Sequence, residues 1–156
     1  MIRNNQACTG GGIGIASGSP LIQLNTITGN GNMGCNGGGG GGIGIVGPTS
    51  AEILDNVISD NMNSFGAGIY MFAAGPPIIK RNIIKGNNAM GGQGGGIYMV
   101  NDSDALIVQN LITGNQASNG GGISWFRVRG PRLVSNRGLP LSIPATTWRP
   151  IFRIRI

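Results

Sequence analysis

The sequence predicts an all-β fold, a solenoid in which short strands stack in parallel from one turn to the next. A six-residue frame, Asn-x-Ile-x-x-Asn, occurs four times, at residues 25–30, 56–61, 82–87 and 110–115. A glycine-rich spacer and a Gly-Ile pair follow each copy. Helical spacing of apolar residues is not sustained anywhere. A motif that returns at a near-constant interval describes a repeat architecture.

The isoleucine after the glycine pair sets the register of about five rungs, which are 26 to 30 residues long. It recurs at Ile13, Ile43, Ile69, Ile97 and Ile123. From this isoleucine to the first Asn of the frame is 12 or 13 residues, and the two Asn residues are always five apart. Nearly all length variation therefore lies in the spacer. Insertions confined to one corner are what a stack of equivalent turns predicts.

Each rung offers three strands of about four residues. In the rung of Ile97 the first strand covers residues 97–100, the second surrounds Ile107 and the third surrounds Ile112. Alternation along a strand places Ile97 and Met99 on one face, with the residues between them on the other. Strands this short cannot form independent hairpins, but they form parallel sheets when they stack at roughly 4.8 Å from rung to rung.

Two columns of asparagine are expected where equivalent residues lie above one another. An amide side chain both donates and accepts, so a stacked column can bond along its own length and satisfy the backbone of a turn. We predict a structural ladder for the first column, and the same role for the second. The first comprises Asn25, Asn56, Asn82, Asn110 and Asn136, and the second Asn5, Asn30, Asn61, Asn87 and Asn115.

The composition excludes several classes of protein. Glycine contributes 31 of the 156 residues, and 40% of all residues are apolar. A disordered glycine-rich linker would not keep so large an apolar share. The net charge is +6, but seven of the eleven basic residues lie between Arg127 and Arg155. A uniformly basic face for nucleic acid is therefore not expected. No run of apolar residues is long enough to span a bilayer.

The chain divides into residues 1–136, which carry the repeats and begin in mid-rung, and a basic tail at 137–156 without the repeat. The tail is interpreted either as a cap over the end of the stack or as a frameshifted end.

The repeat resembles that of the right-handed parallel β-helix proteins in the pectate-lyase-like superfamily, of the secreted bacterial type. The resemblance rests on Gly-Gly-Ile-Tyr at 95–98, Ser19-Pro20 and Asn-x-Ile-x-x-Asn-x-Ala at 82–89 and 110–117. It implies a single-stranded right-handed β-helix, a fragment of a longer array, and a secreted or cell-surface location. It says little about activity, because one fold hosts many functions.

An outward stripe of aromatic residues suggests glycan binding, since ring faces along a groove suit sugar rings. The candidate residues are Tyr70, Phe72, Tyr98 and Phe126, with Val100 in the same stripe. The alternative is that an insertion loop or a neighbouring chain covers them.

No catalytic residue is predicted, because the chain has no histidine and its five acids do not occupy equivalent positions in adjacent rungs. No cofactor is expected. Asp102 and Asp104 are a weak candidate for a calcium site, with a solvated turn as the favoured interpretation. Cys8 and Cys35 are expected as two free thiols, with a disulfide between them as the alternative.

Two functions follow as hypotheses. The first is a non-catalytic structural or surface module that binds a polysaccharide or cell-surface glycan and stacks on further β-helix rungs of its parent chain. The second is a fragment of a carbohydrate-active enzyme, such as a polysaccharide lyase, hydrolase or epimerase, without its catalytic rungs. Enzymatic activity of the fragment is considered the less favoured case.

Overall fold

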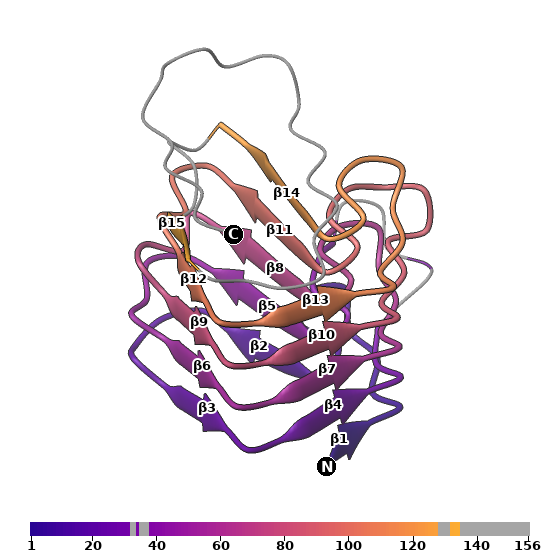
Figure 1. Cartoon of the computed structure of the whole chain (residues 1–156), viewed down its shortest axis with the longest axis horizontal. Coiled ribbons are helices and arrows are strands. Elements are labelled where there is room, and N and C mark those ends of the chain that lie inside the picture. The colour runs from indigo at the N-terminus through magenta and orange to yellow at the C-terminus, as the bar shows by residue number, and fades with distance from the viewer. Residues whose placement is uncertain (32–33, 35–37, 128–131, 135–156) are drawn as a thin grey trace.

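A computed structural model of the protein describes residues 1–31, 34, 38–127 and 132–134. These residues form fifteen short strands and no helix. The strands lie in three five-stranded parallel sheets that stack as a solenoid of about five turns (Figure 1). The predicted all-β solenoid is therefore confirmed.

Every turn contributes one strand to each sheet. Sheet 1 comprises β1 (Ile2–Arg3), β4 (Thr26–Thr28), β7 (Val57–Ser59), β10 (Ile83–Lys85) and β13 (Leu111–Thr113). Sheet 2 comprises β2 (Ile13–Ile15), β5 (Ile43–Val46), β8 (Ile69–Phe72), β11 (Ile97–Val100) and β14 (Ile123–Phe126). Sheet 3 comprises β3 (Leu21–Gln23), β6 (Glu52–Leu54), β9 (Ile78–Lys80), β12 (Leu106–Val108) and β15 (Arg132–Val134).

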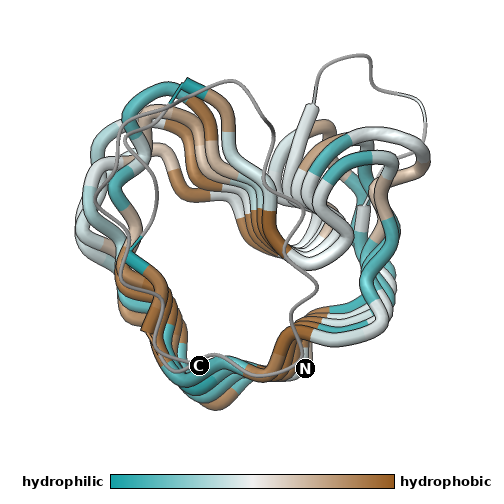
Figure 2. The backbone as a smooth tube through the Cα atoms, turned by 45° about the horizontal axis from the view of Figure 1, so that its top comes forward, coloured by the Kyte–Doolittle hydropathy of each residue, from teal (hydrophilic) through white to brown (hydrophobic). Residues whose placement is uncertain are grey.

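The register of the sheets follows the repeat. Ile69 pairs with Ile97 in sheet 2, and Ile58 pairs with Ile84 in sheet 1. Because equivalent residues face one another, each inward position forms a column of like side chains. Figure 2 shows apolar residues following the strands on all three sides of the coil.

The core is a set of isoleucine columns with a methionine pair. Ile58, Ile69, Ile84 and Ile97 are fully buried. Met71 and Met99 continue the inward side of sheet 2, and both are fully buried. Ile97 and Met99, which the sequence predicts on one face of their strand, are both buried in the core, so this prediction is confirmed. Fully burying one such side chain stabilises the fold by about 1.5–3 kcal/mol.

The glycines before the first four sheet 2 isoleucines, at positions 12, 42, 68 and 96, are required by close packing between turns. A Cβ on Gly68 would lie 2.5 Å from the carbonyl oxygen of Gly96 and 3.1 Å from Nδ2 of Asn87. A side chain at this position would therefore push against the backbone of the next turn and against the asparagine ladder.

The residue before each ladder asparagine has a left-handed backbone, and this bend makes the corner between strands. Leu24, Asp55, Arg81 and Gln109 have φ between 54° and 59°. A non-glycine residue in this conformation costs about 1 kcal/mol or more, so the surrounding stack must hold it there.

The glycine-rich spacers are also stacked. Gly39, Phe65, Gln93 and Asn119 form a row of parallel bridges from one turn to the next. A second row of bridges joins Gly31, Met62, Asn88 and Gln116. The spacers therefore carry the length variation of the repeat and still stack from turn to turn.

Candidate functional site

Asparagine ladders run along two corners of the coil, as the sequence predicts. Nδ2 of Asn82 donates to the carbonyl oxygens of Ile53 at 2.8 Å and Lys80 at 3.1 Å, and to Oδ1 of Asn110 at 3.0 Å. Oδ1 of Asn82 accepts from the backbone N–H of Asn56 at 2.9 Å. Each amide thus joins three turns and leaves no buried polar group of its own without a partner.

The second ladder has the same geometry. Asn61 donates from its backbone N–H to Oδ1 of Asn87 at 3.0 Å, and from Nδ2 to the carbonyl oxygen of Ile27 at 3.0 Å. Asn87 continues the pattern to Oδ1 of Asn115. The last predicted member of the first ladder, Asn136, lies outside the described residues, as does the tail at 137–156.

Beside the first ladder, the surface holds a short charged network. Arg81 donates to both carboxylate oxygens of Asp55, from Nε at 2.6 Å and from an Nη at 2.7 Å, and Gln23 donates to the same carboxylate at 3.1 Å. The pKa of Asp55 is lowered to about 2. The largest cause is hydrogen bonding from Arg81, and the second largest is the hydrogen bond from Gln23. The pair is exposed, so salt screens it.

Asp55→Asn is expected to remove a stabilisation that requires the ionised carboxylate of Asp55 and therefore depends on pH. Asparagine tolerates the left-handed backbone of this position, so the change mainly removes charge. Because the folded pKa lies below its usual value of 3.8, the contact stabilises the fold above that pH and is lost as the pH falls through about 2. Wild type should melt slightly higher than the variant at neutral pH, and the gap should close by about pH 2. A gap that is constant over the whole range would contradict this assignment.

The tyrosines of sheet 2 point out of the coil but are not open. Tyr98 is only 5% exposed and Tyr70 is half-buried. The ring of Phe65, from the spacer, stacks on Tyr98 with centroids 5.7 Å apart, and Tyr70 lies 6.1 Å from Tyr98. A Cβ on Gly39 would lie 2.3 Å from the ring of Tyr70. The expectation that both tyrosines offer ring faces to a glycan is wrong for Tyr98, because the stacked spacers cover it.

This cover also shows in the electrostatics of the two rings. Burial raises the pKa of Tyr70 and of Tyr98, and the neighbouring Tyr70 raises the pKa of Tyr98 further. Both hydroxyls are therefore neutral in ordinary buffers. Phe65 could have been identified from the sequence, because it stands four residues before Ile69, as Gln93 does before Ile97.

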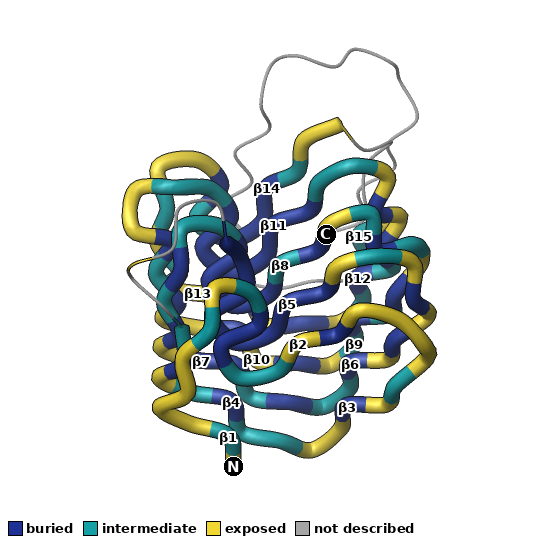
Figure 3. The backbone as a smooth tube through the Cα atoms, turned by 180° about the vertical axis from the view of Figure 1, so that it is seen from behind, coloured by how far each residue is buried: buried dark blue, intermediate teal, exposed yellow. Residues whose placement is uncertain are grey.

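The last residue of each four-residue strand of sheet 2 is exposed or partly exposed, and these residues form what we call the exposed column. The column consists of Val46, Phe72, Val100 and Phe126, paired from turn to turn. Phe72 is 37% exposed and Phe126 is 50% exposed. The guanidinium of Arg127 lies 5.2 Å from the ring centre of Phe126. In Figure 3 the strands of sheet 2 are buried along most of their length and become exposed toward this end of β14.

The five acidic residues are not gathered into a catalytic or metal site. Asp102 and Asp104 are exposed on a turn, and Ser103 between them is buried, with its hydroxyl donating to the carbonyl oxygen of Val100. Among the described residues, no three His, Cys, Asp or Glu side chains come together.

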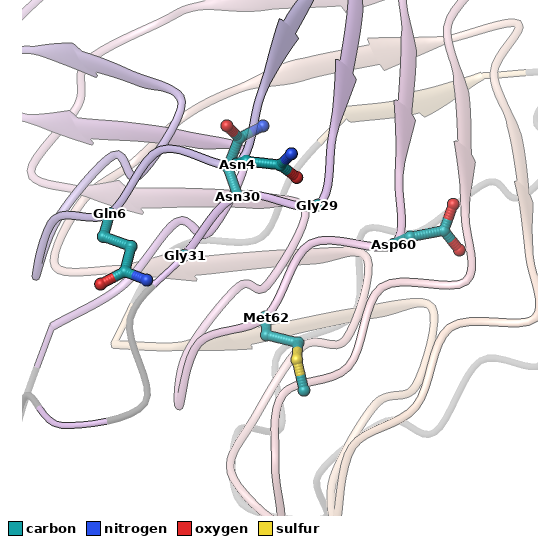
Figure 4. A pocket seen from close by; sticks show the side chains of 7 residues that line it. All are labelled: Asn4, Gln6, Gly29, Asn30, Gly31, Asp60 and Met62. Carbon is teal, nitrogen blue, oxygen red and sulfur yellow. The ribbon is translucent and has the colours of Figure 1, made fainter.

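A pocket of about 310 Å³ opens near the N-terminal end of sheet 1 (Figure 4). Its lining is Asn4, Gln6, Gly29, Asn30, Gly31, Asp60 and Met62. In the figure the amides of Asn4 and Asn30 lie together while the carboxylate of Asp60 points away from them. Asp60 is the one acidic residue in this lining, so the pocket does not hold the pair of carboxylates that general acid–base catalysis would use.

Cys8 is disulfide-bonded, and its carbonyl oxygen accepts a hydrogen bond from Nδ2 of Asn63 at 3.2 Å. The other cysteine of the chain, Cys35, lies outside the described residues. The expectation of free thiols is therefore wrong for Cys8.

No helix in the described part of the chain is long and apolar enough to cross a membrane. Comparison of the chain with protein-family models, with curated proteins and with solved structures finds no match.

Proposed function

We propose that the chain is a non-catalytic module of a secreted or cell-surface protein, and that its exposed column on sheet 2 binds an extended glycan. The observation that carries the proposal is the alignment of Phe72 and Phe126 in one column, each paired with Val100. They stand two turns apart in one column, with only Val100 between them. At roughly 4.8 Å per turn the two rings are separated by about 10 Å, a distance that two successive sugar rings span.

The surroundings of the column suit a sugar chain better than a buried protein contact. Aromatic rings and valine supply an apolar strip, and Arg127 and Asn101 supply donors at its edge. The strip is held by hydrogen-bonded sheets and by the ladders, so it is ordered before a ligand arrives, which lowers the entropy lost on binding.

The proposal extends to the origin of the module. A disulfide at Cys8 fits an oxidising compartment, which supports a secreted or surface location. The connections between parallel strands are expected to be right-handed, as such connections nearly always are. The likeness to the pectate-lyase-like β-helix proteins is supported by the solenoid of three parallel sheets and by the asparagine ladders.

Binding should be tested with a glycan array and then by calorimetry on any hit. Phe72→Ala and Phe126→Ala are each expected to weaken binding about tenfold, which corresponds to about 1.4 kcal/mol. Leu111→Ala is the matched control, because Leu111 is a similarly exposed apolar residue on sheet 1. An array without hits, or equal losses in all three variants, would refute glycan binding at this column.

A further inference from the structure

The exposed column on sheet 2 alternates in side-chain size from one turn to the next. Val46 pairs with Phe72, Phe72 with Val100, and Val100 with Phe126. Valine is shorter than phenylalanine, so the two rings stand above the valines. In Figure 3 the strands of sheet 2 lie one above another, so the column follows the axis of the coil. At roughly 4.8 Å per turn, the period of this alternation is about 10 Å.

The alternation is confined to the part of sheet 2 that a ligand can reach. The second outward column of this sheet does not alternate, and it consists of Gly44, Tyr70, Tyr98 and Ser124. Tyr98 and Ser124 are buried, whereas Val46, Phe72 and Phe126 are exposed. The period of two turns is therefore not imposed by the repeat, and it characterises the accessible surface.

A flat ribbon of β-1,4-linked sugars has a matching period. In such a chain, joined through equatorial bonds, each ring is turned over relative to the one before it, so every second ring presents the same face. Each ring also lengthens the chain by nearly the rise of one turn of the coil. Two like faces of C–H bonds can therefore lie over Phe72 and Phe126, with the ring between them over Val100. An α-1,4-linked chain of the same sugar coils instead and leaves the column.

The polar groups beside the column suit a neutral chain. Asn101 and Arg127 directly follow Val100 and Phe126, so their side chains can donate to hydroxyl groups at the edge of a ribbon. Asp102 is also exposed, and its backbone N–H donates to the carbonyl oxygen of Arg127 at 3.2 Å. Because this carboxylate stands in the turn next to the guanidinium, it offsets the positive charge that an acidic sugar would need.

We propose that the ligand of the exposed column is a neutral, flat-ribbon polysaccharide with β-1,4 linkages, built from glucose, mannose, xylose or N-acetylglucosamine. This inference rests on the proposed function and adds the linkage and the charge of the glycan. Val46 and Phe126 are three turns apart, about 14 Å, so four sugar rings cover the column. Three rings reach from Phe72 to Phe126.

Calorimetry of the whole chain with oligosaccharides of defined length tests this assignment. The β-1,4-linked series of the four sugars are compared with α-1,4-linked glucose oligosaccharides, which are the matched control for linkage. At least one β-1,4 series should bind about tenfold tighter than the α-1,4 series. Its affinity should rise steeply from the disaccharide to the trisaccharide and level off beyond the tetrasaccharide.

The double variant Val100→Phe, Phe126→Val tests the period itself. It keeps two valines and two phenylalanines in the column but places the rings one turn apart, where successive sugars present opposite faces. Its affinity for the β-1,4-linked tetrasaccharide should fall about tenfold. Circular dichroism establishes that the variant retains its sheets, and the length series on wild type decides the question if it does not.

The outcomes separate this inference from the proposed function. Glycan hits confined to other linkages or to acidic chains would overturn the inference and leave glycan binding in place. So would equal affinity for α-1,4-linked chains, full affinity for a disaccharide, or unchanged affinity in the folded double variant. A glycan array without any hit would overturn both.

Discussion

Asn82→Ala is expected to lower the free energy of unfolding by about 3–5 kcal/mol. The side chain is 1% exposed, and its loss leaves the N–H of Asn56 without its partner and takes one hydrogen bond from the carbonyl oxygen of Ile53. Each buried group without a hydrogen bond costs about 1–3 kcal/mol. The deleted amide also leaves a space in the corner that alanine cannot fill.

Urea denaturation followed by circular dichroism measures this loss. Asn88→Ala is the matched control, because Asn88 is partly exposed and its Oδ1 accepts one hydrogen bond, from the N–H of Met90 near the surface. The control should cost less than about 1 kcal/mol. If the two variants were equally stable, the ladder would not be the source of stability that its geometry implies.

Gly68→Ala is expected to destabilise the coil by about 3 kcal/mol, which is near the upper end of the usual cost of adding a methyl group to a well-packed interior. The added Cβ would lie 2.5 Å from the carbonyl oxygen of Gly96, which belongs to backbone and cannot turn away. The neighbouring turn must move apart, and the ladder at Asn87 and the column at Ile84 move with it.

Gly14→Ala separates this steric effect from the ordinary consequence of replacing glycine. The nearest atom to a Cβ on Gly14 is 3.8 Å away, and the residue is exposed in β2. Its substitution should be neutral, or should stabilise the fold by up to about 1 kcal/mol, because alanine lowers the conformational entropy of the unfolded chain. Equal unfolding midpoints for the two variants would show that turns can separate at Gly68 without cost.

The fold could be predicted from the sequence because its determinants repeat. Gly-Ile, the inward isoleucines and the paired asparagines recur with the same internal spacing, and every one of them serves the contact between turns. The charged pair of Asp55 and Arg81 also follows from the register, since both residues immediately precede a ladder asparagine in adjacent turns.

The exposed surface was harder to predict, since strand alternation shows which side of a sheet a residue is on and not what lies above it. Tyr98 and Phe72 both point outward, yet Phe65 covers only the first. The cover comes from the spacers, and the spacing of Phe65 from Ile69 identifies it as part of the stack. That spacing does not show that its ring lies over Tyr98. The same uncertainty applied to Cys8, whose pairing depends on how one spacer is folded.

The left-handed corners have a consequence for how the chain folds. Leu24 is 79% exposed with φ of 59°, so nothing in its own side chain favours the bend. Gln109 is also exposed and has a φ of 54°. A single turn in isolation would relax out of this conformation, and only the next turn's amides hold it. Folding should therefore begin with two adjacent turns forming together and then proceed rapidly by adding one turn at a time, as in other linear repeats.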